Sequence, residues 1–307
     1  MNRVWLSVPG IVIAIALVSG MHARQIDKQK TVPPGTLVVI GSHKLHLHCM
    51  GTGNPTILFE AGVGDFSTRW TLVQEVVSKR FRACAYDRAG SGWSETGPQP
   101  RTMKQEVYEL HTLLNKAEIS GPYVLVGHSY GGLLVRLYAE QYGKDVIGIV
   151  LVDPTHESTR LVVQRRGEPQ GKWVRIREDA KGLSVPDVQK TKTITPPEWQ
   201  NYWAEELQQM YESRKGNPEP LGDRPLIVLA ADKPSTNPAE TPDNLWNDLQ
   251  REKSDQKADL ARLSRNSKLV RDPSSGHHIH VENAQLVVRA IEEVIEAAVR
   301  HTMLSGK

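Results

Sequence analysis

The candidate nucleophile of this sequence is Ser129, the central residue of the run Gly127-His128-Ser129-Tyr130-Gly131. The apolar, β-branched segment 122–126 before the run is typical of a buried strand, and apolar residues at helical spacing follow it. A serine on so tight a strand-to-helix turn has a strained backbone and an exposed hydroxyl, and the flanking glycines remove side chains that would collide. The spacing therefore predicts a nucleophile held at the edge of a sheet.

A serine hydroxyl is a weak nucleophile at neutral pH, so it needs a positioned base, and histidine titrates in the right range. Three histidines lie close together near the C-terminus, namely His277, His278 and His280. His277 follows an expected strand around 269–270 and a Ser-Gly turn, so its imidazole could reach back to Ser129. His278 and His280 remain competing candidates for the base.

A carboxylate must orient the imidazole, and the chain order serine, acid, histidine allows Asp153 or Asp232. Asp153 ends the strand expected at 146–152, beside the strand that carries Ser129. Asp232 follows the next expected strand, 226–229. We favour Asp153 from the way strand ends place carboxylates, and keep Asp232 as the alternative acid.

Two backbone N–H groups are expected to form an oxyanion hole that stabilises the charge developing on an attacked carbonyl. The N–H of Tyr130 follows the nucleophile directly. The second comes from Val63, because Gly62 and Gly64 let the backbone approach closely there. Both groups are predicted from their place in the chain.

The elements that must position these residues alternate in type along the chain. After an expected hairpin formed by 36–40 and 44–49, strand patterns alternate with amphipathic helical patterns. This alternation predicts an α/β fold, with a mostly parallel twisted sheet flanked by helices. The remaining strand patterns fall at 56–60, 81–86, 122–126, 146–152, 226–229 and 269–270.

The interval 155–222 shows no strand pattern and breaks the alternation. Its aromatic residues, Trp199 and Trp203 among them, predict a helical cap over Ser129, since long insertions are usually functional and aromatics usually bury. The predicted core then comprises 36–154 and 223–307.

The N-terminal residues 1–23 combine Arg3 with the apolar stretch 11–18, which predicts a signal peptide or an uncleaved N-terminal anchor. In either case the remainder lies outside the cytoplasm, periplasmic or secreted, and an anchor would attach it to the membrane. The polar segment 24–35 is expected to be a linker.

Charge and cysteine content bear on which classes of partner the chain could bind. The chain has 307 residues and a net charge of +3 without a long basic run, which gives no argument for nucleic acid. Its two cysteines, Cys49 and Cys84, show no metal-binding spacing, and no cofactor or metal is implied. In an exported chain the pair predicts one disulfide, and two buried free thiols are the alternative.

Four motifs in order resemble those of the α/β-hydrolase superfamily over residues 37–299. One departure is Ala61, where many relatives have histidine. The motifs are Glu60-Ala61-Gly62-Val63-Gly64, Asp87-Arg88-Ala89-Gly90-Ser91-Gly92-Trp93-Ser94, the turn at Ser129, and Ser275-Gly276-His277-His278-Ile279-His280-Val281-Glu282.

The resemblance implies a serine hydrolase, a carboxylesterase, that cleaves an ester or related acyl bond of a small molecule through an acyl-enzyme. It favours His277 as the base, and it implies that the strand with Cys49 runs antiparallel beside the strand with Cys84. An iminopeptidase-type peptidase and a non-enzymatic ligand-binding receptor on the same fold are the alternatives, because fold alone does not settle activity.

Overall fold

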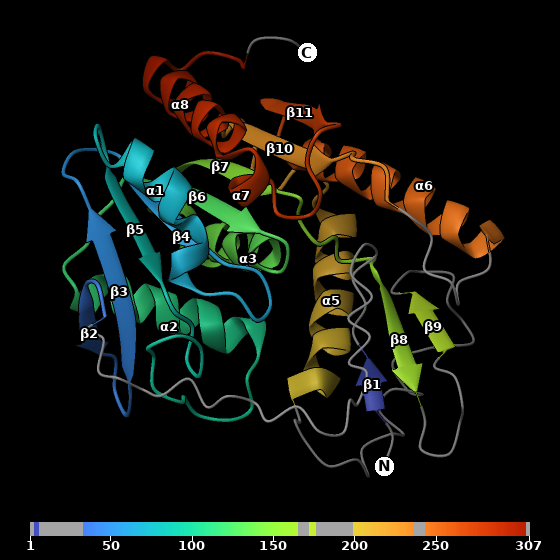
Figure 1. Ribbon diagram of the computed structural model, residues 1–307, viewed down its shortest axis with the longest axis horizontal. Coiled ribbons are helices and arrows are strands. Elements are labelled where there is room, and N and C mark those ends of the chain that lie inside the picture. The colour runs from blue at the N-terminus through green and yellow to red at the C-terminus, as the bar shows by residue number, and fades with distance from the viewer. Residues whose placement is uncertain (1–2, 6–32, 165–171, 176–198, 236–242, 305–307) are drawn as a thin grey trace.

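The computed structural model describes residues 3–5, 33–164, 172–175, 199–235 and 243–304. Its centre is an eight-stranded sheet with helices on both faces (Figure 1). Every neighbouring pair from β5 to β11 is parallel, whereas β3 is antiparallel to both β2 and β5. In spatial order the strands are β11 (Ser267–Asp272), β10 (Leu226–Ala231), β7 (Val146–Val152), β6 (Tyr123–His128), β4 (Thr56–Glu60), β5 (Arg82–Tyr86), β3 (Lys44–Met50) and β2 (Thr36–Val39). The predicted fold class is thus confirmed.

The strand β6 lies in the middle of the sheet and is buried on both faces. Because successive side chains of a strand point to opposite faces, Leu125 joins the core under α2 (Met103–Lys116) and α3 (Gly131–Tyr142). Val124 and Val126 join the opposite core, under α1 (Thr71–Val77) and α8 (Ala284–Arg300). Its C-terminal end, where Ser129 follows, is therefore fixed from both sides.

Short elements join these helices to the sheet. A 3-10 turn, η1 (Ser67–Trp70), leads into α1, and a single turn, α7 (Ile279–Glu282), precedes α8. The long helix α6 (Asp243–Leu260) ends in η3 (Ala261–Leu263), and η2 (Gly143–Asp145) follows α3.

The interval predicted as a helical cap contains one helix, α5 (Trp199–Gly216), but also two strands that the prediction missed. The strands β8 (Arg160–Gln164) and β9 (Lys172–Arg175) pair antiparallel, and β1 (Arg3–Trp5) pairs with β8. The wholly helical description was wrong, because the β-branched run in β8 is too short between charged residues to show alternation. Residues 165–171 and 176–198 of this interval lie outside the described residues.

The helix α5 is anchored to the core by charged side chains. Glu206 accepts hydrogen bonds from the N–H groups of Met103 (2.8 Å) and Lys104 (3.1 Å), at the N-terminus of α2. Arg214 donates to Glu157 (2.7 Å), a carboxylate that Arg136 of α3 also contacts at 2.7 Å. A carboxylate at a helix N-terminus satisfies unpaired N–H groups, so these contacts fix α5 against α2 and α3.

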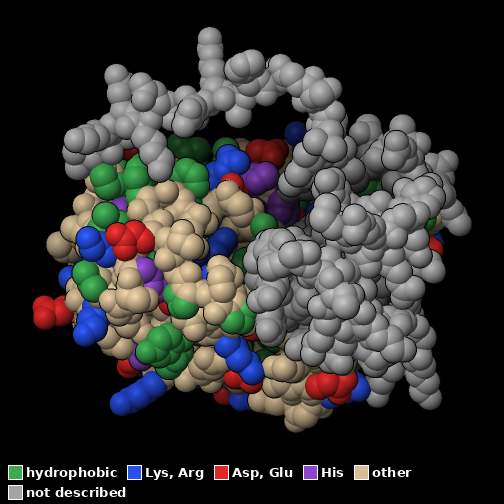
Figure 2. All heavy atoms as spheres, turned by 90° about the horizontal axis from the view of Figure 1, so that it is seen from below, with side chains coloured by type: hydrophobic (Ala, Val, Ile, Leu, Met, Phe, Trp, Pro, Cys, Tyr) green, Lys and Arg blue, Asp and Glu red, His purple; other side chains and the backbone are tan. Residues whose placement is uncertain are grey.

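Most of the predicted leader, residues 6–23, and most of the predicted linker lie outside the described residues. The described part of the leader is residues 3–5, which form β1. None of the helices in the described ranges is long and apolar enough to cross a membrane. On the described part of the face in Figure 2, basic and acidic side chains lie interspersed among hydrophobic and uncharged ones.

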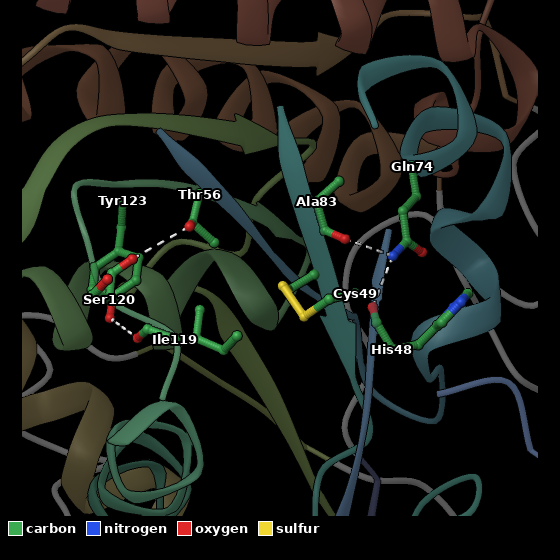
Figure 3. Close-up of a disulfide and its surroundings, with 9 residues drawn as sticks. His48, Cys49, Thr56, Gln74, Ala83, Ile119, Ser120 and Tyr123 are labelled. Atoms are coloured by element: carbon green, nitrogen blue, oxygen red, sulfur yellow. Dashed lines mark hydrogen bonds between the residues drawn. A yellow bond between two sulfur atoms is a disulfide. The ribbon is translucent and has the colours of Figure 1, made fainter. Parts of the chain in front are cut away.

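The two cysteines lie directly opposite each other on neighbouring antiparallel strands. Cys49 of β3 is the register partner of Cys84 of β5, and the two are joined by a disulfide with an S–S distance of 2.05 Å. Gln74 of α1 donates to the backbone oxygens of His48 (2.8 Å) and Ala83 (2.9 Å) on the two strands (Figure 3). A side chain of α1 and the disulfide therefore connect the same pair of strands.

We expect protein purified without reductant to show no free thiol after denaturation. Because the bridge closes a loop with a sequence separation of 35 residues, the double variant Cys49→Ala, Cys84→Ala should lose about 3–4 kcal/mol of unfolding free energy in the chain-entropy model. Thiol counting and urea unfolding provide the two measurements, with reduced wild-type protein as the control. Two free thiols per chain in the unreduced protein would contradict the bridge.

Candidate active site

Ser129 occupies the turn between β6 and α3 with a φ of 52°, a left-handed conformation that is uncommon for a residue other than glycine. The turn is tight, because a Cβ at Gly131 would lie 2.4 Å from the backbone oxygen of Glu60. Its backbone is tied to β7, since Ser129 N–H donates to Val152 O at 3.1 Å. This is the strained strand-to-helix turn that the sequence predicts for a nucleophile.

His277 and Asp153 are brought together. Asp153 follows β7, and its Oδ2 lies 2.6 Å from Nδ1 of His277. The Asp153 carboxylate is fully buried and also accepts a hydrogen bond from Ala231 N–H at 3.2 Å. The alternative acid, Asp232, is 40% exposed and pairs instead with Arg271 at 3.2 Å. The geometry therefore joins His277 to Asp153 and leaves Asp232 at the surface.

Two lysines of α6 also reach the Asp153 carboxylate, which the sequence reasoning did not anticipate. Nζ of Lys257 lies 3.2 Å from one oxygen, and Nζ of Lys253 lies 3.4 Å from the other. Burial by itself raises the pKa of Asp153, but the charge of Lys257 and the hydrogen bond to His277 hold it well below the usual range. Burial lowers the pKa of Lys257 to about 8, although Asp153 opposes that shift.

The imidazole of His277 lies beside the Ser129 turn through its contacts with His128. Nε2 of His128 donates to the backbone oxygen of His277 at 2.9 Å, and the two ring centroids are 4.6 Å apart. The hydroxyl of Ser129 makes no hydrogen bond to any described residue. Catalytic hydrogen bonds of this kind often tighten only when substrate binds.

The loop after β4 carries Val63 and passes close to Ser129. A Cβ placed on Gly62 would lie 3.4 Å from Cβ of Ser129 and 2.9 Å from Nδ1 of His128. Val63 is half exposed, whereas Tyr130 is buried at the start of α3. The loop and the first residue of α3 thus flank the nucleophile, as expected of the two predicted oxyanion donors; their role stays a prediction.

Arg88 holds that loop in place. Its Nη1 donates to Ala61 O at 2.7 Å and its Nη2 to Gly62 O at 2.6 Å, while Nη1 also pairs with Glu60 at 2.5 Å. Tyr86 donates to the second oxygen of Glu60. Burial raises the pKa of Glu60 to about 7, although the charge of Arg88 opposes the shift. The guanidinium fork of Arg88 thus ties the loop of Val63 to the end of β4.

The other two candidate histidines lie near the turn without contacting Asp153. His278 Nε2 lies 3.8 Å from Asp65, and His280 packs against Trp70 with ring centroids 4.6 Å apart and ring planes tilted by 35°. Asp65, His128 and His280 each offer an atom within 4.8 Å of those of the other two, so together they could hold a metal ion.

A pocket of about 290 Å³ borders His277 and Gly276 and is lined by Lys253, Lys257 and Asp232. A larger pocket, about 490 Å³, lies between α3 and α5, and Ser129, His277 and Asp153 are absent from its lining. Of Ser129, His277 and Asp153, the smaller pocket is lined by His277 alone.

The comparisons with known proteins agree with this architecture. An uncharacterized protein of Bacillus subtilis (strain 168), YqjL, is 29% identical over 251 residues, which are 82% of this chain and 87% of that protein. A thermophilic esterase from Thermogutta terrifontis has a similar fold, with 21% identity, a TM-score of 0.56, and coverage of 87% of this chain and 99% of the esterase. A meta-cleavage product hydrolase from Pseudomonas fluorescens IP01 gives 17% identity and a TM-score of 0.57, covering 86% and 98% of the two chains.

The model of the alpha/beta hydrolase family matches residues 45–290. This range includes the Ser129 turn, the loop of Val63, Asp153 and His277. Together with the eight-stranded sheet and its helices, the match shows that the chain belongs to the alpha/beta hydrolase family.

Proposed function

We propose that this hydrolase cleaves a carboxylic ester, or a related acyl bond of a small molecule, through an acyl-enzyme formed on Ser129. The observation that carries the proposal is the buried 2.6 Å contact between His277 Nδ1 and Asp153 beside a serine whose φ is 52°. A serine nucleophile, a histidine base and an orienting carboxylate form the arrangement that acyl transfer uses.

In the proposed reaction, Asp153 accepts a hydrogen bond from Nδ1–H of His277, which leaves Nε2 to take the Ser129 proton. The serine oxygen attacks the acyl carbonyl, and the N–H groups of Tyr130 and Val63 stabilise the resulting oxyanion. His277 then protonates the leaving alcohol. Water, deprotonated by the same imidazole, hydrolyses the acyl-enzyme and restores the serine.

We also propose an extracytoplasmic location, periplasmic or secreted, with or without attachment through the N-terminus. The apolar stretch 11–18 and the disulfide between Cys49 and Cys84 support it, because disulfides persist mainly in oxidising compartments.

Replacing Ser129 with Ala, or His277 with Ala, should lower kcat by about 10⁴–10⁶-fold, because nucleophile and base act as one unit. The measurement is steady-state kinetics on a panel of p-nitrophenyl esters of increasing chain length, with a proline amide included to detect peptidase activity. Circular dichroism checks that each variant is folded. Retention of more than about a tenth of the wild-type activity by Ser129→Ala would show that the nucleophile lies elsewhere.

Substitution of each aspartate distinguishes the two candidate acids, Asp153 and Asp232. Asp153→Asn should lower kcat by about 10⁴-fold, because the amide cannot orient the imidazole and stabilise its charge. Asp232→Asn is the matched control and should leave kcat within about twofold, since its carboxylate faces Arg271 at the surface. A large loss in the Asp232 variant with an active Asp153 variant would exchange the two assignments.

Arg88→Lys should lower kcat by about 10²-fold with little change in KM, because a lysine keeps the charge beside Glu60 but cannot donate to two carbonyls as a fork. The loop of Val63 would then shift relative to Ser129. Arg271→Lys serves as a control, because Arg271 pairs with Asp232 away from that loop. If kcat is unchanged while Arg88→Lys remains folded, Arg88 does not position the oxyanion loop.

A further inference from the structure

Two buried histidines beside the Ser129 turn have ring nitrogens without hydrogen-bond partners among the described residues: both nitrogens of His280, and Nδ1 of His128. Each side chain is only 1% exposed. Nearly all buried polar atoms in proteins are satisfied, so three such nitrogens in one place require an explanation. The two ring centroids are 4.3 Å apart, which places the nitrogens in a single small region.

The hydrogen bonding of both rings suits a cation. His280 makes no hydrogen bond to the described residues through either ring nitrogen, so its unprotonated nitrogen can face an ion. His128 donates its Nε2–H to the backbone oxygen of His277, which leaves Nδ1 as its free ligand atom. A histidine that binds a metal usually donates its other ring N–H in this way.

We propose that Asp65, His128 and His280 form a binding site for a divalent cation of the zinc class. Two imidazole nitrogens and a carboxylate oxygen are ligands that Zn²⁺ accepts, whereas Ca²⁺ and Mg²⁺ prefer sites made of oxygens. The three residues come from the loop after β4, the end of β6 and α7, which the fold brings together.

The ligand atoms must close in slightly around the ion. They lie within 4.8 Å of one another, whereas tetrahedral zinc bonds of about 2.0–2.1 Å place ligands about 3.4 Å apart. Asp65 is the member best able to move, because its side chain is 13% exposed, whereas each histidine is 1% exposed. His278, with Nε2 at 3.8 Å from Asp65, is placed to supply a fourth ligand.

Arg69 is the group that opposes the cation. Its Nε lies 2.7 Å from Oδ1 of Asp65, and its side chain is 47% exposed. An exposed arginine can swing into solvent at low cost, since such surface ion pairs contribute little. Zinc would therefore compete with Arg69 for Asp65, and removal of the guanidinium should tighten binding.

Occupancy of the site would inhibit hydrolysis, a consequence that rests on the proposed function. The ring of His128 lies 4.6 Å from that of His277. A dication bound to His128 would therefore repel the positive charge that His277 gains when it takes the proton of Ser129. Binding itself needs no catalysis, and the Ser129→Ala variant should bind Zn²⁺ as the wild type does.

The test is calorimetric titration of the full chain with Zn²⁺, checked by equilibrium dialysis. We expect one ion per chain, with affinity at least about tenfold lower in Asp65→Asn and in His280→Gln. Arg69→Gln should bind more tightly, and His301→Asn, which removes an exposed histidine, should be unchanged. Zinc should inhibit the wild-type enzyme and should fail to inhibit His280→Gln at the same concentration.

The decisive comparison is with His277→Ala, which should retain the zinc site. Loss of binding in His277→Ala, together with full binding in His280→Gln, would make the catalytic imidazole the ligand and overturn the proposal. Equal zinc affinity in the wild type and in Asp65→Asn would also overturn the proposal. If His280→Gln does not fold, the affinity of Asp65→Asn is the deciding measurement. Absence of ester hydrolysis with intact zinc binding would contradict the proposed function and leave the metal site standing.

Discussion

The candidate active site depends on a buried carboxylate that must stay ionised, that of Asp153. Burial of a single charge is costly, and the protein offsets the cost with Lys253 and Lys257 and with the 2.6 Å contact to His277. The two ammonium groups keep the carboxyl group of Asp153 ionised, but they also interact with the same carboxylate as His277 does. The acid is thereby fixed at one place behind the imidazole, at the end of β7 and next to the end of β6.

A second buried charge pair acts on the other side of Ser129. Glu60 ends β4 and Arg88 follows β5, so their ion pair spans two neighbouring strands before the guanidinium reaches the carbonyls of the Val63 loop. Removing one partner of such a pair leaves an uncompensated buried charge, which is strongly destabilising. The same residues that stabilise this edge of the sheet thus also hold the carbonyls of the loop that passes beside the nucleophile.

Much of the fold could be predicted from the sequence, because the central strands are buried on both faces and give continuous apolar runs such as 146–152. The turn at Ser129 could also be predicted, since its glycines and its place between strand and helix are local features. The helix α6 was missed because its charged sequence buries only a few residues, Leu249 and Leu260 among them.

The choice of acid and the histidine cluster required three dimensions. Chain order admits both Asp153 and Asp232, and the placement of strand ends favours Asp153. The contact of Asp153 with His277 and the pairing of Asp232 with Arg271 become visible only in the fold. Likewise, His128 and His280 are 152 positions apart in the sequence, so no local spacing predicts that their rings lie close together. Tertiary contacts of this kind leave no periodic signal in a single sequence.

The most direct measurement of the central claim is labelling of the native protein with a fluorophosphonate probe, followed by peptide mass spectrometry. We expect one adduct per chain, on the peptide that contains Ser129, with ester hydrolysis lost in proportion to labelling. Full labelling at a different serine, or ester hydrolysis that persists when Ser129 is completely modified, would contradict it.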